Sequence, residues 1–204
     1  VEFGNGHSVW LALTGVLAAC GDAGSGLAGH AAFAPTSPQV FSTGSPTKDE
    51  DPSVLLARDG SLYVAWFSDR DGAGDIYVSR DDRQQNWSAA QRVTLDPGGD
   101  FYPTIVQDAA GTFHLTWFRW YAYFRGHILH STSADGLSWN VADEESVTTD
   151  VDVDDWLPTP AFAGDGTMFI YFVSDLRDAV NPTSQIYMTK KGPSDVAWST
   201  PDTL

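Results

Sequence analysis

The sequence predicts an all-β fold built from a four-stranded antiparallel unit that occurs three times. A pattern of about 50 residues recurs from Asp49 to the end of the chain. Aromatic residues make up 13% of the chain, and aromatic and β-branched side chains favour strands. The 19 glycines and 11 prolines allow the frequent turns that many short strands require. Repeat, composition and turn residues therefore all indicate short strands rather than helices.

Each unit opens with Asp-x-x-Pro, and the three copies begin at Asp49, Asp100 and Asp155, which are 51 and 55 residues apart. A turn glycine and a closing tryptophan mark each copy as well. The glycines are Gly60, Gly111 and Gly166, and the tryptophans are Trp87, Trp139 and Trp198. The expected second strands are 62–67, 113–118 and 168–173, and the expected third strands begin at 75, 127 and 185.

Four short strands in about 50 residues are typical of a β-propeller blade. We therefore predict a propeller domain at 37–204 with three blades, at about 49–95, 100–148 and 155–204. A β-sandwich is the alternative, but in a sandwich the Asp-x-x-Pro motif, the turn glycine and the closing tryptophan would not recur together at the same spacing. Because propellers usually close with four to eight blades, we expect a fragment of a larger, six-bladed propeller. A homodimer that pools its blades is the alternative.

The N-terminal segment contains an uncharged, mostly apolar run at 9–17, too short to span a membrane. It leads into Leu17-Ala18-Ala19-Cys20, which resembles a bacterial lipobox. The resemblance implies a lipoprotein signal peptide at 1–20, a lipid anchor on Cys20 and a flexible tether at 21–36. The protein is then expected at the bacterial cell envelope or surface. A buried helix with one free cysteine is the alternative.

The stretch Ser133-Ala134-Asp135-Gly136-Leu137-Ser138-Trp139 predicts a tight turn, since Asp bonds its own backbone and Gly accepts positive φ. It resembles the Asp-box (BNR) hairpin of the sialidase superfamily, in the form S-x-D-G-x-x-W. The resemblance implies structural roles for Ser133, Asp135, Gly136 and Trp139. The first and third units carry only degenerate copies of this box.

In sialidase-like propellers the ligand lies on the face opposite the box turns, where the inter-blade loops and the second-to-third strand loops meet. Carboxylates, guanidinium groups and aromatic rings converge there, and sugar sites use such side chains. The ligand-binding candidates are Asp69, Arg70, Asp100, Tyr102, Arg119, Trp120, Tyr121, Tyr123, Arg125, Trp156, Asp175 and Arg177. Solvated acidic turns are the alternative for most of them. The aromatic segment 119–125 either packs on a neighbouring blade or stacks on a ligand.

With 27 acidic and 11 basic residues, the net charge is −16, and nucleic acid is not an expected partner. No glycine-rich phosphate loop follows a strand, so no nucleotide cofactor is predicted. A calcium-like pattern at 69–75 lacks the glutamate at the twelfth position of an EF-hand loop, and a second at 150–154 would place its carboxylates on one side only in an extended chain. The five histidines lack zinc-site spacing. We therefore predict no cofactor, and a structural calcium ion is left open without being predicted.

The sequence leaves two classes of function open. A sialidase needs an arginine triad, and its first arginine sits in an Arg-Ile-Pro signature, whereas the triplets at 50–52, 101–103 and 156–158 contain no arginine. The pattern therefore favours a non-catalytic, envelope-anchored propeller that binds carbohydrate or a cell-surface protein. The alternative is a glycoside hydrolase, either an exo-α-sialidase or an enzyme like the arabinanases and xylosidases. In the latter families an Asp-Pro motif resembling Asp51-Pro52 carries the catalytic carboxylate.

Overall fold

The computed structural model describes residues 47–84, 86–121, 125–150, 152–175, 177 and 183–203. The predicted signal peptide, Cys20, the tether, the first residues of the predicted propeller domain (37–46) and Tyr123 lie outside these ranges. No helix within them is long and apolar enough to cross a membrane.

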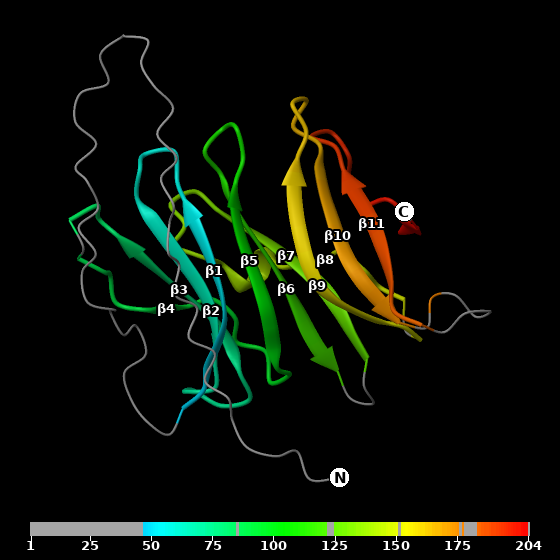
Figure 1. Ribbon diagram of the computed structural model, residues 1–204, viewed down its shortest axis with the longest axis horizontal. Helices are drawn as coiled ribbons and strands as arrows, with labels where there is room; N and C mark the ends of the chain where they lie inside the picture. Colours follow the sequence, from blue (N-terminus) through cyan, green and yellow to red (C-terminus); the bar gives the residue numbers. More distant parts are fainter. Residues whose placement is uncertain are drawn as a thin grey trace, which may run out of the picture. The chain divides into compact units, whose positions relative to one another are not determined.

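The described chain forms three antiparallel four-stranded sheets of consecutive strands, and a single parallel pair joins the second and third of them into one eight-stranded sheet (Figure 1). The first is β1 (Asp49–Leu56), β2 (Leu62–Ser68), β3 (Asp75–Asp81) and β4 (Gln91–Arg92). The second is β5 (Asp100–Gln107), β6 (Phe113–Tyr121), β7 (Arg125–Ser133) and β8 (Glu145–Ser146). The third is β9 (Asp154–Phe162), β10 (Met168–Asp175), β11 (Gln185–Lys191) and β12 (Asp202–Thr203). We call these sheets blades 1, 2 and 3.

The first strands of the three blades lie side by side, with β5 in contact with both β1 and β9 (Figure 1). A single parallel pair, Gly126 with Asp154, also links β7 of blade 2 to β9 of blade 3. Antiparallel blades that adjoin along their first strands confirm the predicted all-β blade architecture.

The closing strand of each blade is short and has only two residues. In blade 2 the chain does not return as a strand directly after Trp139. It first forms a short 3₁₀ helix, η1 (Val141–Asp143), which the side chain of Asn140 caps, and only then forms β8. The Asn140 side chain accepts a hydrogen bond from Ala142 N and donates one to Asp143, and such local bonds favour a turn over strand pairing.

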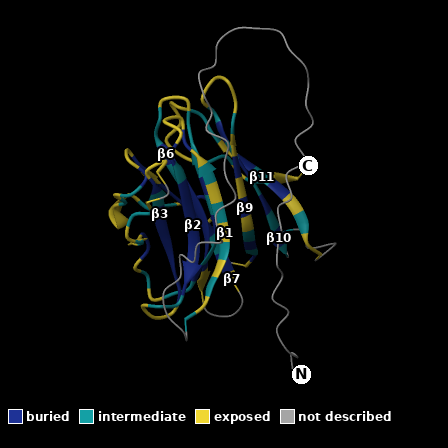
Figure 2. Cartoon of the chain, turned by 60° about the vertical axis from the view of Figure 1, so that its left-hand side comes forward, coloured by how far each residue is buried: buried dark blue, intermediate teal, exposed yellow. Residues whose placement is uncertain are grey.

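Two apolar cores hold the blades together. Tyr63, Phe113 and Trp117 belong to the core between blades 1 and 2, and Phe118, Ile128 and Phe172 belong to the core between blades 2 and 3. Figure 2 shows the resulting difference between strands. β2 is buried along nearly its whole length, whereas β1 alternates between half-buried and exposed residues. Each blade is therefore packed mainly through its second and third strands.

The turn after β7 is held by its own side chains. Asp135 Oδ1 accepts hydrogen bonds from the backbone N–H groups of Leu137 (2.9 Å) and Ser138 (2.7 Å). Ser133 Oγ accepts one from Gly136 N (3.0 Å), and Trp139 Nε1 donates to the Gly136 carbonyl (3.1 Å). Gly136 has φ +72°, and a Cβ there would lie 2.6 Å from the ring of Tyr63 in blade 1. Glycine is thus required by backbone conformation and by space.

These hydrogen bonds predict a pH-dependent contribution to stability. The backbone N–H groups of Ser138 and Leu137 lower the pKa of Asp135 to about 2. A carboxyl whose pKa is lower in the folded state stabilises the fold above its ordinary pKa and loses this effect as pH falls through about 2. Because Asp135 is exposed, we expect Asp135→Asn to cost only about 1 kcal/mol near neutral pH. The cost should shrink steadily between pH 4 and pH 2 in urea unfolding curves. Exposed Asp202→Asn is the control, and an equal pH-dependent loss in that variant would contradict the assignment.

Candidate functional site at the start of the first strands

The third residue of each Asp-x-x-Pro motif has a left-handed backbone conformation. Asp51, Tyr102 and Leu157 have φ values of 55°, 52° and 54°, and the strand register shifts at each of them. A non-glycine residue in this region carries strain of about 1–2 kcal/mol. Because the same bulge occurs in all three blades, it is a built-in feature that directs these residues away from the sheet ladder.

The three bulges meet around a small hollow of about 200 Å³. Its lining comes from equivalent positions of the three blades: Asp51 and Pro52, Tyr102 to Thr104, and Leu157 to Thr159. The repeat therefore builds one shared concave surface from three separate chain segments. Binding sites in such folds commonly lie where several elements converge in this way.

Asp51 is the one carboxylate among the three equivalent bulge residues. Burial and the neighbouring Glu50 raise its pKa, although the Tyr102 backbone N–H donates a hydrogen bond to it. A partly buried carboxyl with a raised pKa, facing a hollow, is a candidate for acid–base chemistry. Tyr102 and Leu157 occupy the matching positions in blades 2 and 3, so the hollow is chemically asymmetric.

Ion pairs within each blade engage four of the predicted ligand-binding residues. Arg70 contacts Asp49 at 2.7 Å, Arg119 contacts Asp100 at 2.7 Å, and Arg177 contacts Asp155 at 2.5 Å. These pairs join the first or second residue of the first strand to the end of the second strand, or to the loop after it, in every blade. The aspartate of each pair is the first residue of an Asp-x-x-Pro motif, and we call these ion pairs the Asp–Arg braces.

The brace in blade 2 is the most buried. The Asp100 side chain is fully buried, and it accepts hydrogen bonds from Arg119 and from Trp117 Nε1 (3.1 Å). Arg119 also contacts Glu144 at 2.8 Å, and its guanidinium lies over the Trp117 ring. Arg119 and Asp100 thus hold blade 2 together, and this role competes with ligand binding.

The other predicted ligand-binding residues fall into two groups. Aromatic rings lead from blade 1 to blade 3 beside the hollow: Phe67 and Phe101 are 4.7 Å apart, Phe101 and Tyr102 6.3 Å, and Tyr102 and Trp156 6.4 Å. Trp120 lies 6.4 Å from Phe101 and keeps 44% of its surface exposed, while Tyr121 packs edge-on against His127. The structure therefore brings Tyr102, Trp120 and Trp156 into one aromatic group.

The remaining residues of this list are acidic groups and their partners. Asp69 accepts a hydrogen bond from the Lys48 backbone, and Arg125 pairs with Asp152 at 2.5 Å. Asp175 lies near Asp154, and burial together with this neighbour raises the pKa of Asp154. One oxygen of each of these two carboxylates is buried without a hydrogen-bond partner among the residues that the structure describes. Asp154 thus joins Asp51 as a carboxyl with a raised pKa at this end of the blades.

The two calcium-like patterns are occupied by other contacts. Asp71 accepts a hydrogen bond from the Tyr77 hydroxyl, and Asp75 pairs with Arg92 at 2.8 Å. Asp150 pairs with Arg177 and Asp152 with Arg125. Within the described ranges, no three acidic, histidine or cysteine side chains form a group that could hold a metal ion.

No family model matches the sequence, and no curated protein does. Solved structures do match the fold. An α-L-arabinofuranosidase from Fusarium graminearum superposes with a TM-score of 0.60 at 14% identity, over 80% of this chain and 50% of that one. An α-L-arabinanase from Penicillium chrysogenum gives 0.57 at 14% identity, over 76% and 50%. A GH43_12 protein from a capybara gut metagenome gives 0.58 at 12% identity, over 76% and 30%.

These similarities confirm the β-propeller fold class, and the neighbours named above are glycoside hydrolase-type propellers. The chain spans half or less of the length of these structures. At such low identity, the comparison establishes the fold and leaves the chemistry to the residues of the site.

The Asp–Arg braces predict unequal losses of stability. Asp100→Asn leaves the buried Arg119 guanidinium with one partner fewer, and we expect a loss of about 3 kcal/mol in the free energy of unfolding. Asp49→Asn is the matched substitution in blade 1, where Arg70 is more exposed, and there we expect about 1 kcal/mol. Urea unfolding of both variants measures the difference. Equal losses would contradict a buried structural role for the blade 2 pair.

Proposed function

We propose that this chain belongs to a carbohydrate-active propeller that hydrolyses a neutral, pentose-containing glycan, with Asp51 as a catalytic carboxylate. The observation that carries the proposal is the position of Asp51. It lies on a strained bulge, faces the hollow shared by three blades, and has a pKa raised by burial and by Glu50. The fold neighbours, two of which are named as arabinan- or arabinoside-cleaving enzymes, support the substrate class.

Glycoside hydrolysis requires a carboxylate that acts as base or nucleophile and a second carboxyl that acts as acid. Asp51, held in a rigid bulge, suits the first role because its position is set by the backbone rather than by a flexible loop. The aromatic group of Tyr102, Trp120 and Trp156 supplies flat apolar surfaces beside it. Sugar rings stack on such surfaces through their C–H faces, which would orient the substrate at Asp51.

A non-catalytic glycan- or protein-binding module is the second candidate, and one observation favours it. The bulge positions of blades 2 and 3 carry Tyr102 and Leu157, so only one of three equivalent positions provides a carboxylate. Tyr102 and Leu157 are better suited to contact a ligand than to transfer protons. Such a module would use the same hollow and the same aromatic group.

Sialidase activity has less support. An arginine triad that grips a substrate carboxylate must keep its guanidinium groups available. Arg70, Arg119 and Arg177, which are the arginines repeated in the three blades, are each paired with the aspartate of their own brace. The net charge of −16 would also repel an anionic sugar.

The central test compares hydrolysis of arabinan, arabinoxylan, and the chromogenic arabinofuranoside, xyloside and sialoside by the full chain and by Asp51→Asn. We expect turnover of a pentose substrate and a loss in kcat of at least about 100-fold in the variant, because proton transfer is removed while the side chain keeps its shape. Asp165→Asn, in the turn after β9, is the control and should keep full activity.

A companion variant separates a catalytic from a structural effect. Glu50→Gln removes a negative neighbour of Asp51 and should move the acid limb of the kcat/KM profile to lower pH. Full activity of Asp51→Asn would refute the catalytic assignment. Binding of these glycans without turnover by the parent chain would instead establish the binding module.

We also propose that the protein is lipid-anchored through Cys20 at a bacterial envelope, with residues 21–36 as the tether. The lipobox-like Leu17-Ala18-Ala19-Cys20 and the small-residue stretch after it support this. Expressed in a bacterium with labelled palmitate, the full chain should incorporate label and sediment with membranes. Cys20→Ser should abolish both, and a labelled Cys20→Ser protein would contradict the proposal.

A further inference from the structure

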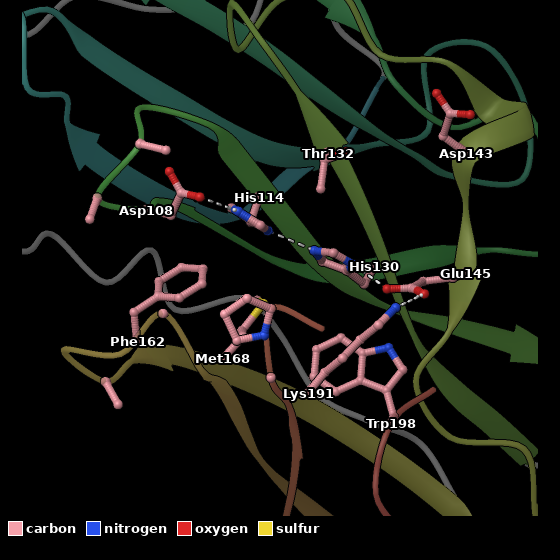
Figure 3. A pocket seen from close by; sticks show the side chains of 16 residues that line it. Asp108, His114, His130, Thr132, Asp143, Glu145, Phe162, Met168, Lys191 and Trp198 are labelled. Carbon is pink, nitrogen blue, oxygen red and sulfur yellow. Dashed lines mark hydrogen bonds and ion pairs between the residues drawn. The ribbon is translucent and has the colours of Figure 1, made fainter. Parts of the chain in front are cut away.

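A second and larger hollow, of about 610 Å³, lies between blades 2 and 3 (Figure 3). Its walls include the β5–β6 turn, the β9–β10 turn and the turn after β11. Asp108, which lines it, follows the last residue of β5, whereas Tyr102 of the first hollow lies near the start of β5. At about 3.3 Å per strand residue, Tyr102 and Asp108 are about 20 Å apart along β5, so the two hollows lie toward opposite ends of this strand. We call the larger one the inter-blade pocket.

The equivalent place between blades 1 and 2 is filled with apolar side chains. Strand register pairs Val78 with Ala65 in blade 1 and His130 with Thr116 in blade 2, which makes Val78 and His130 equivalent. By the same register, Tyr63 is equivalent to His114. Tyr63 and Val78 belong to the first apolar core, where Leu137 and Trp139 of blade 2 pack against them. Two histidines replace these residues next to blade 3, and there the core gives way to a pocket.

The pocket has a continuous aromatic wall that crosses from blade 3 to blade 2 and back. Phe162 lies 4.9 Å from His114, His114 is stacked at 5.2 Å on His130, and His130 lies 5.6 Å from Trp198. Met168 adds a flexible apolar side chain beside this row (Figure 3). Apolar faces of this kind suit the C–H side of a sugar ring.

Polar groups run along the same wall as one hydrogen-bonded chain. His114 Nδ1 lies 3.0 Å from His130 Nε2, His130 Nδ1 lies 2.8 Å from Glu145, and Glu145 lies 2.6 Å from Lys191 Nζ (Figure 3). Burial and the neighbouring His130 lower the pKa of His114 to about 4. Although burial opposes it, hydrogen bonds from His130 and Lys191 hold the pKa of Glu145 at about 2. An ammonium group and a carboxylate therefore lie side by side in the pocket at neutral pH.

This chain of groups leaves hydrogen-bonding capacity unused. Lys191 has three N–H donors, and each carboxylate oxygen of Glu145 can accept more than one hydrogen bond. Among the residues that the structure describes, the buried Trp198 Nε1 has no hydrogen-bond partner, and the buried His114 Nε2 has only a long contact of 3.5 Å with Asp108. Because buried polar atoms are nearly always hydrogen-bonded, these atoms indicate that the wall is suited to a polar ligand rather than to apolar packing.

The balance of donors and acceptors limits the ligand. The pocket is lined by three acidic side chains, Asp108, Asp143 and Glu145, and by one lysine, Lys191, so an anionic ligand is disfavoured. A cationic ligand is disfavoured as well, because Lys191 already lies over the Trp198 ring on which a cation would bind. Hydroxyl groups both donate and accept, so they can accept from Lys191 and donate to a neighbouring carboxylate. We propose that the inter-blade pocket is a second binding site, for one or two neutral sugar residues of a glycan.

The proposed site does not require Asp51 to be catalytic, so the two ideas can fail separately. Isothermal titration calorimetry of the full chain with arabinotriose, xylotriose and mannotriose, and with sialyllactose as an anionic comparator, tests it. The key variant is His114→Tyr with His130→Val, which installs the residues that fill the equivalent place between blades 1 and 2. We expect at least a tenfold rise in the Kd of the neutral sugar, with no fall in the unfolding temperature.

A second pair of variants guards against an indirect effect of the histidines. Ala109→Phe places a ring at the pocket wall, and Ala89→Phe places one at an exposed position of blade 1 away from it. We expect Ala109→Phe to weaken sugar binding and Ala89→Phe to leave it unchanged. The proposal is overturned if the chain binds no neutral sugar or prefers sialyllactose. It is also overturned if binding is lost in Asp51→Asn but kept in both Ala109→Phe and the double histidine variant.

Discussion

The Asp–Arg brace is the interaction on which the rest of this structure depends. In each blade it ties the aspartate that opens the Asp-x-x-Pro motif to an arginine at or after the end of the second strand. In blades 1 and 2 a tryptophan Nε1 from the second strand donates to the same aspartate. Because the strand is held at this point, the next residues can leave the ladder without unravelling it. The brace thus makes the strained bulge sustainable in every blade.

The repeated blades give rise to the three bulges, and the residues that differ between equivalent positions of the blades give the two hollows their chemical character. Three equivalent bulges create the first hollow, but only Asp51 brings a carboxylate into it. Of the two inter-blade contacts in the described part of the chain, the one lined by His114 and His130 is open and polar, whereas the other is filled with apolar side chains. A repeat stabilises a scaffold through identical contacts, so residues that break the repeat without breaking the fold are free to serve a ligand.

Part of this arrangement could be predicted from sequence, because it depends on local chemistry. Asp135 and Gly136 specify a turn that their own backbone and side chains complete, and the alternating runs of β6 and β10 specify strands. The arginines were predicted as ligand groups because their spacing places them in loops of the right face. Their actual partners lie about 20 residues earlier in the chain, and sequence does not reveal such pairings. The inter-blade pocket was missed for a similar reason, since His114 and Phe162 belong to different blades.

The sequence by itself determined the all-β class, the number of blades in this chain and the turn that ends β7, since each depends on repetition or on contacts within a few residues. Only the tertiary structure decided which carboxylate faces a hollow, which arginines are engaged and where two blades leave a space. Those properties arise from side chains about 20 to 70 residues apart, such as Arg119 on Asp100 and Tyr63 on the carbonyl of Asp135. Their contacts are set by how the blades pack, and packing is a property of the whole fold rather than of any local stretch.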